Sequence, residues 1–202
     1  MLFDFGGVLL RQDWHAYDEF GRDHGLPEGA LRDALYRTPE WRALNVGQGD
    51  RDSWAAAAIR ELSRFVDSRA EVVFEAWRAR PFERHEPNIA LAQALKAAGT
   101  RLGLLSNAAA DLEQLITEQF EVHIDFDDRV ISGLVGMAKP EPEIFHLASE
   151  RIGVRPEGCF FIDDLPANVE AARSVGMQAY NFVGDDYDGL RSALLSAGYR
   201  WE

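Results

Sequence analysis

Cysteine is nearly absent from this sequence. Cys159 is the only one among 202 residues, so no disulfide can form within the chain, and its apolar neighbours Phe160 to Ile162 predict a buried, inert thiol. No apolar run approaches the roughly 20 residues that cross a bilayer. No basic segment precedes an apolar stretch at the N-terminus, as it would in a signal peptide. These absences predict a soluble protein of the reducing cytoplasm.

Positive charge is scarce as well. The chain has 21 lysines and arginines against 34 aspartates and glutamates, which gives a net charge of -13. The average field therefore repels phosphodiester backbones and anionic lipid surfaces, so we expect neither nucleic acid nor membrane as a partner. A small anionic substrate would need a metal ion or a well-placed lysine to offset this field.

The composition is otherwise that of an ordinary folded protein, with 47% hydrophobic and 27% charged residues. The length allows one sizeable domain, or one domain with a smaller insert. Apolar residues recur at helical intervals between Asp13 and Glu83, with no strand pattern among them. The Gly-rich residues 46–50 indicate a turn within this part, and Asp52 or Ser53 is expected to cap the next helix.

After Glu83, short apolar strands alternate with helices. The alternation predicts a parallel sheet with right-handed crossovers and helices on both faces, which is a Rossmann-like α/β core. This core comprises residues 1–12 and 84–202, and residues 13–83 form a small all-helical cap inserted after the first strand. The expected helices are 87–98, 140–152, 168–175 and one at the C-terminus; the expected strands are 1–3, 101–105, 158–162 and 178–183.

Polar residues stand where three of these strands end. Asp4, Ser106 and the pair Asp163–Asp164 each follow a strand, and ligands of parallel sheets bind beyond the carboxyl ends of the strands. Each has a simpler explanation when taken singly. Asp4 could begin a turn, and Ser106 could cap a helix. The acidic pair could also cap a helix, although adjacent carboxylates repel each other unless a cation lies nearby.

Taken together with Lys139, these residues supply the parts needed for phosphoryl transfer. Lys139 precedes Pro140 at the start of a helix, where a solvated surface lysine is the plain alternative. The set would comprise a carboxylate nucleophile, a hydroxyl that binds phosphate, a positive charge and a divalent metal site. Carboxylate oxygens suit Mg²⁺, which binds through one or two carboxylates plus substrate phosphate.

The ordered motifs resemble the haloacid dehalogenase (HAD) superfamily, and in particular its sugar-1-phosphate phosphatase-like branch. The matching stretches are LFDFGGV, LLSN, AKPEPEIF and FFIDDLPANVEAA, and the helical part resembles the cap of that family. The resemblance covers essentially the whole chain. It implies the HAD fold and a phosphatase that works through an aspartyl-phosphate.

The resemblance also implies a role for each matching residue. Asp4 would be the nucleophile, and Ser106, with the Asn107 backbone, would hold the phosphoryl group. Lys139 would neutralise both the phosphate and Asp4. The Mg²⁺ ligands would be Asp4, the Gly6 carbonyl, Asp164 directly and Asp163 directly or through water.

Gly6 departs from the usual family pattern, which has an acid at this position. Such an acid protonates the leaving group and later activates water, help that is typically worth about 10²–10⁴-fold. Asp13, His15 and Asp50 are possible substitutes, with a solvated surface role as the alternative for each. The first strand is also very short, so a missing upstream stretch is possible.

Three functions remain open at this stage. The first is an Mg²⁺-dependent phosphatase acting on a small phosphorylated metabolite such as a sugar phosphate. The second is a metal-independent 2-haloacid dehalogenase, against which the acidic pair and the lack of an aromatic residue at Gly6 argue. The third is a non-catalytic phosphate-binding or regulatory protein. Trp41, Arg42 and the turn Gly47–Gly49 could face the substrate or serve packing alone, and the sequence leaves the oligomeric state open.

Overall fold

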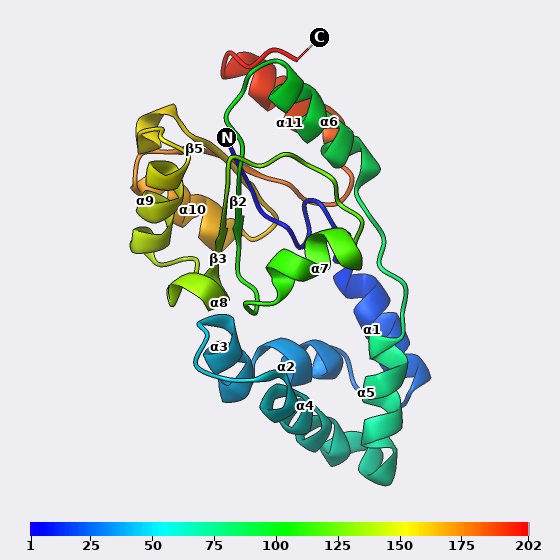
Figure 1. Cartoon of the computed structure of the whole chain (residues 1–202). Helices are drawn as coiled ribbons and strands as arrows, with labels where there is room; N and C mark the ends of the chain where they lie inside the picture. Colours follow the sequence, from blue (N-terminus) through cyan, green and yellow to red (C-terminus); the bar gives the residue numbers. More distant parts are fainter. Residues whose placement is uncertain (202) are drawn as a thin grey trace.

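Five parallel strands form a single sheet in the computed structural model, which describes residues 1–201 (Figure 1). The spatial order is β3-β2-β1-β4-β5. The strands are β1 (Leu2–Phe3), β2 (Gly103–Ser106), β3 (Asp128–Ile131), β4 (Phe160–Asp163) and β5 (Gln178–Asn181). Because β1 pairs with both β2 and β4, the strand order reverses at β1. The carboxyl edge beside β1 is therefore the expected position of a ligand site.

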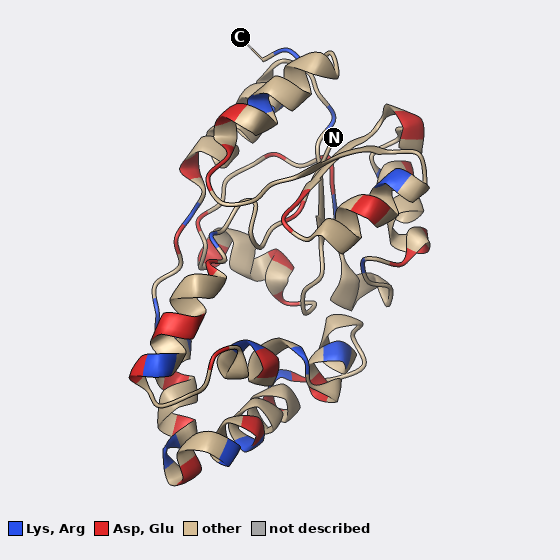
Figure 2. Ribbon diagram, turned by 180° about the vertical axis from the view of Figure 1, so that it is seen from behind, with Lys and Arg blue, Asp and Glu red and all other residues tan. Residues whose placement is uncertain are grey.

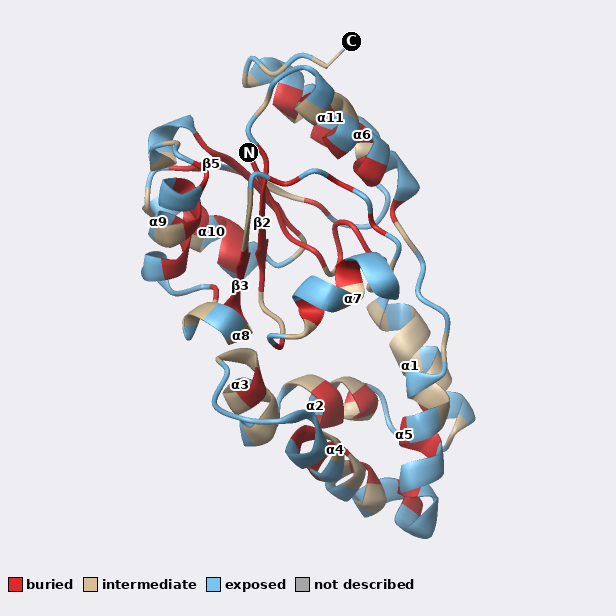
Figure 3. Ribbon diagram, in the orientation of Figure 1, coloured by how far each residue is buried: buried red, intermediate tan, exposed pale blue. Residues whose placement is uncertain are grey.

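Alternate side chains of the strands supply two separate hydrophobic layers. Phe3 packs in one layer and its neighbour Leu2 in the other, since successive strand residues point to opposite faces. On the first face lie α6 (Glu86–Ala97), α7 (Leu112–Glu118) and α11 (Tyr187–Ser196). On the second lie α9 (Pro142–Arg151) and α10 (Pro166–Ser174), with the short α8 (Ser132–Val135) nearby. Figure 3 shows the buried strands between these helices, so the predicted α/β fold is confirmed.

The helical insertion has its own hydrophobic cluster, centred on buried residues such as Trp54, Leu62 and Phe74. Its helices are α1 (Trp14–Asp23), α2 (Ala30–Tyr36), α3 (Pro39–Asn45), α4 (Arg51–Val66) and α5 (Ala70–Arg78). They lie beyond the carboxyl ends of the strands in Figure 1. Figure 2 shows that charged residues of both signs gather on helices and linkers around the sheet.

The two linkers to the insertion pair with each other. Leu10 and Arg84 form an antiparallel bridge. The amide of Arg11 donates to the carbonyl of Glu83 at 2.7 Å, and the amide of His85 donates to that of Leu9 at 2.9 Å. The insertion thus leaves and re-enters the α/β core at one point. Among the described residues, no helix combines the length and apolar character needed to cross a membrane.

Some sequence expectations were wrong in detail. The cap of α4 is Asp50, whose carboxylate accepts the amide of Ser53 at 2.7 Å and its hydroxyl at 2.9 Å, so neither Asp52 nor Ser53 is the cap. The edge strand β3 was not expected. It begins with the charged pair Asp128-Arg129, which breaks the apolar pattern of a buried strand.

Candidate active site

Lys139 is the centre of the candidate site. Its Nζ lies 2.8 Å from Asp4 Oδ1 and 2.7 Å from Asp163 Oδ2, and it donates to the carbonyl of Leu105 at 2.9 Å. The Lys139 side chain is only 1% exposed. Burial opposes the positive charge, but the carboxylates of Asp163 and Asp4 outweigh it and raise the pKa of Lys139. The lysine is therefore a fixed positive charge at the carboxyl edge of the sheet.

Asp4 directly follows β1 and is buried. Its Oδ1 accepts both Lys139 and the amide of Phe5, the latter at 2.7 Å, whereas Oδ2 accepts no hydrogen bond within residues 1–201. Burial raises the pKa of Asp4 well above its ordinary value, Lys139 opposes that shift, and the negative charges of Asp163 and Asp164 add to it. One carboxylate oxygen is thus held in place while the other is available for chemistry or for a cation.

Asp163 has both carboxylate oxygens bonded within the protein. Oδ1 accepts the amide of Leu165 at 2.8 Å and the side-chain amide of Asn168 at 3.0 Å, while Oδ2 accepts Lys139. No exposed area remains on its side chain, at 0%. Asp163 is therefore mainly an anchor for Lys139. Sequence reasoning assigned no part to Asn168, although this residue lies within the matching stretch FFIDDLPANVEAA, which was the signal that could have indicated it.

Asp164 is the more accessible member of the acidic pair. Burial, and then the negative charge of Asp163, raise the pKa of Asp164 to about 6. Its side chain packs against Gly7, where a Cβ would lie 2.6 Å from Asp164 Oδ2, and Gly7 has a φ of +79°. Both the close approach and the backbone conformation require glycine there. Gly7 thus allows the first loop to pack against Asp164.

The arrangement fits a hard divalent cation. Asp4, Asp163 and Asp164 each offer a carboxylate oxygen, and these oxygens lie within 4.8 Å of one another. The carbonyl of Gly6 accepts no hydrogen bond within residues 1–201, so it is a further free oxygen. An oxygen-only donor set with closely spaced negative charges is what Mg²⁺ prefers.

Ser106 and Asn107 end β2 beside this cluster. Ser106 is buried and its hydroxyl makes no hydrogen bond within the described chain. The Asn107 side chain instead holds the Lys139 backbone, since its Nδ2 donates to the Lys139 carbonyl and its Oδ1 accepts the Lys139 amide, both at 2.8 Å. Ser132, which the sequence reasoning missed, accepts the amide of Ala108 at 2.9 Å and steadies the loop.

Two of the three predicted substitutes for an acid at Gly6, Asp13 and Asp50, are caps of helices in the insertion. Asp13 caps α1 by accepting the amides of His15 and Ala16, and Asp50 caps α4. Hydrogen bonds from Ser53 lower the pKa of Asp50, which opposes proton donation near neutral pH. His15 is exposed on the first turn of α1. Helix capping thus explains the presence of the carboxylates of Asp13 and Asp50.

An aromatic cavity of about 600 Å³ lies between the insertion and the core. Tyr17, Tyr36, Trp41, Trp54 and Trp77 line it from the insertion, and α7 contributes Asp111 and Leu115. The hydroxyls of Tyr17 and Tyr36 lie 3.0 Å apart. Of the two residues for which the sequence left both substrate contact and packing open, Trp41 lines this cavity, whereas Arg42 is exposed and does not. The turn Gly47–Gly49 abuts the core backbone, because a Cβ on Gly47 would collide with the carbonyl of Gly133.

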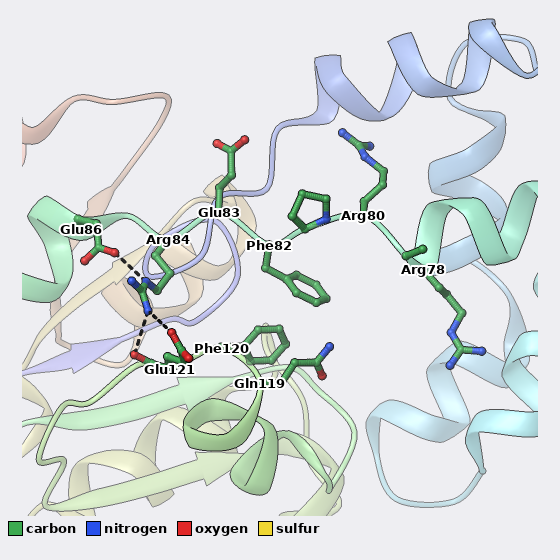
Figure 4. A pocket seen from close by; sticks show the side chains of 11 residues that line it. Arg78, Arg80, Phe82, Glu83, Arg84, Glu86, Gln119, Phe120 and Glu121 are labelled. Carbon is green, nitrogen blue, oxygen red and sulfur yellow. Dashed lines mark hydrogen bonds and ion pairs between the residues drawn. The ribbon is translucent and has the colours of Figure 1, made fainter.

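A second cavity, of about 740 Å³, adjoins the linker between α5 and α6. Figure 4 shows Phe82 beside Phe120, with ring centroids 4.6 Å apart, and Arg84 between Glu86 and Glu121. None of the strand-end residues lines either cavity. This second cavity lies along the linker, and the carboxylate cluster is the group of side chains that could carry out chemistry.

Comparison with known proteins identifies the family. The family model for haloacid dehalogenase-like hydrolases matches residues 1–176. The chain belongs to this family, and the predicted enzyme class of HAD-like hydrolase is confirmed.

Individual relatives span nearly the whole chain. A phosphatase of Mycobacterium tuberculosis is 29% identical, over 98% of this chain and 94% of its own. Fructose-1-phosphate phosphatase of Escherichia coli is 27% identical, over 89% of this chain and 93% of its own. Among solved structures, a HAD-family enzyme of Bacteroides thetaiotaomicron in complex with magnesium and inorganic phosphate has a TM-score of 0.62 and 22% identity, covering 89% of this chain and 91% of its own.

Proposed function

We propose that this protein is a magnesium-dependent phosphatase that hydrolyses a small phosphate monoester, with a sugar phosphate as the leading class. The observation that carries the proposal is the buried Lys139, bonded to both Asp4 and Asp163, beside a free Asp4 Oδ2. A nucleophilic carboxylate fixed by a cation at the edge of a parallel sheet suits in-line attack on phosphorus. The names of the M. tuberculosis and E. coli relatives support the same chemistry.

In this proposal Asp4 Oδ2 attacks phosphorus, the bond to the leaving oxygen breaks, and an aspartyl-phosphate forms. Water then attacks that phosphorus and releases inorganic phosphate and the Asp4 carboxylate. Lys139 holds Asp4 in position and offsets negative charge on the phosphoryl oxygens. The Ser106 hydroxyl, which no protein group of the described chain engages, and the Asn107 backbone bind those oxygens.

The donor set supports Mg²⁺ as the cofactor. Asp4, Asp164 and the Gly6 carbonyl would hold it, and Asp163 would contribute through water, because both its oxygens are bonded to protein groups. When bound, the ion supplies positive charge against the substrate phosphate and the carboxylates. That charge also favours the ionised forms of Asp4 and Asp164, whose pKa values burial raises.

The helical insertion, residues 13–83, serves as a cap in this proposal. The aromatic cavity between it and the core would take the part of the substrate beyond the phosphate. Aromatic faces pack well against the apolar faces of sugar rings and against other flat groups, and such lining is typical of small-molecule sites.

A screen of phosphate release from a panel of phosphorylated metabolites, with Mg²⁺ and with excess EDTA, tests the proposal. We expect release with Mg²⁺ and none with EDTA. Halide release from chloroacetate would indicate the dehalogenase reaction instead. If neither phosphate nor halide is released, and inorganic phosphate binds measurably, the protein is non-catalytic.

A further inference from the structure

The α-carbon of Gly6 faces the side-chain amide of Gln12. A Cβ built on Gly6 would lie 3.0 Å from Gln12 Oε1, and beyond the chain neighbours no other described atom lies within 4 Å of that Cβ. The loop turns back here because Gly6 pairs with Leu10 in an isolated bridge and the Gly7 amide donates to the Leu10 carbonyl at 2.8 Å. Gln12 thus occupies the space into which a side chain at position 6 would extend.

This amide is half-buried and has no hydrogen-bond partner within residues 1–201. On one side of it, Gly6 contacts Gln12 and the next residue, Gly7, packs against Asp164. On the other, its chain neighbours Arg11 and Asp13 line the aromatic cavity. A partly shielded amide without a protein partner gains from a polar group supplied by a ligand. Along the chain, Gln12 therefore lies between the loop that packs on Asp164 and residues that line the cavity proposed for the rest of the substrate.

We propose that Gln12 replaces the acid absent at position 6, and that its Nε2–H donates a hydrogen bond to the leaving oxygen of the substrate. The proposal rests on the phosphatase function. As the bond between phosphorus and the leaving oxygen breaks, that oxygen departs with the electron pair and then takes a proton from water. In the second step, Gln12 Oε1 accepts a hydrogen bond from the attacking water, whose proton passes to the released phosphate.

The substitution of an amide for an acid selects the substrate class. An amide stabilises charge on the leaving oxygen but transfers no proton near neutral pH, so the gain from general acid catalysis is absent. Esters whose leaving oxygen is already a weak base lose least. Gln12 therefore favours phosphate monoesters such as anomeric sugar phosphates and aryl phosphates over primary alkyl phosphates such as sugar-6-phosphates.

The test is kcat/KM over a series of aryl phosphates of graded leaving-group pKa, measured at several pH values. For Gln12→Glu we expect a shallower dependence on leaving-group pKa, at least about a tenfold gain on the poorest leaving group, and a new loss of that gain at high pH, where the glutamate is ionised. For Gln12→Ala we expect about a tenfold loss across the series. Gln178→Glu is the control, because Gln178 is the first residue of β5 and so lies at the amino ends of the strands, away from the carboxylate cluster at their carboxyl ends.

If Gln12→Glu and Gln12→Ala both keep the wild-type rates and the wild-type dependence on leaving-group pKa, the role of Gln12 is overturned and the phosphatase function still stands. A wild-type protein that releases phosphate from no member of the series would overturn the phosphatase function with it. If Gln12→Glu does not fold, the pair Gly6→Asp and Gly6→Asp/Gln12→Ala decides, since removing the amide opens the space for the new carboxylate. The double variant is then expected to show a shallower dependence of kcat/KM on leaving-group pKa than Gly6→Asp alone. If both variants show the same dependence as wild type, the role of Gln12 is overturned.

Discussion

The ammonium of Lys139 lies 2.8 Å from the carboxylate of Asp4 and 2.7 Å from the carboxylate of Asp163, so it bridges the two aspartates. Three charged side chains that are distant in the sequence thus form one buried unit. Removing one partner of such a unit leaves an uncompensated charge in a poorly solvated place. The unit therefore links the stability of the sheet edge to the chemistry proposed there.

The first prediction concerns Lys139→Met. The change leaves Asp4 and Asp163 facing each other without a cation, so we expect a loss of about 3–5 kcal/mol in the free energy of unfolding. Phosphatase activity is expected to fall by at least about 100-fold. Urea unfolding and phosphate release measure the two effects. The control is Lys96→Met, which removes the other lysine and its surface pair with Asp127 and should cost less than about 1 kcal/mol. Equal costs for both variants would contradict the buried unit.

The second prediction is that Asp4→Asn abolishes turnover in a folded protein. The amide keeps the shape of the carboxylate but does not attack phosphorus, so activity should fall by at least about 100-fold. Phosphate release at saturating Mg²⁺ measures this, and mass spectrometry of acid-quenched wild-type enzyme should detect a phosphoryl group that the variant lacks. Asp52→Asn, on the exposed side of α4, should be unchanged. A tenth of wild-type activity in Asp4→Asn would exclude Asp4 as nucleophile.

The third prediction separates the two members of the acidic pair. Asp163→Ala frees Lys139 and Asn168 from their shared partner, so the metal-free protein should lose about 3–5 kcal/mol. Asp164→Ala removes a carboxylate whose raised pKa marks an unfavourable ionised form, so the metal-free protein should become more stable at pH 7. The stabilisation that Mg²⁺ provides should be lost chiefly in Asp164→Ala. Thermal unfolding with and without Mg²⁺ measures both, and identical responses of the two variants would disprove the division.

The fourth prediction concerns pH and His85. Burial, with the positive charge of Arg11 adding to it and Asp185 opposing, lowers the pKa of His85 from 6.5 to about 4. The unfolded chain therefore binds a proton between these values that the folded chain does not, and the contribution of His85 to stability is lost as the pH falls through this window. Between pH 7 and pH 5 the stability advantage of wild type over His85→Gln should shrink by about 2 kcal/mol. A stability difference between wild type and His85→Gln that stays constant from pH 7 to pH 5 would refute the prediction.

The strand-end residues were predictable because periodicity alone determines where a strand stops. Asp4, Ser106 and the acidic pair follow short apolar runs, and parallel topology then brings their backbones to one edge. The nearness of Lys139 to that edge followed from the family resemblance, since nothing in the pattern distinguishes it from a solvated lysine. The contact between Gly6 and Gln12 was not predictable, because the fold of a loop without periodicity decides it.

The paired linkers have a consequence for how this architecture can vary. Backbone hydrogen bonds between residues 9–11 and 83–85 close the base of the insertion, as they close the base of a hairpin loop. For the sheet, the whole insertion is therefore equivalent to one long loop. The entropy of closing a loop rises by only about 0.6 kcal/mol for each doubling of its length. Residues between the linkers can therefore be shortened, lengthened or exchanged at little cost to the five strands. The carboxylates at the strand ends keep their positions through such changes, because the strands hold them and the insertion does not.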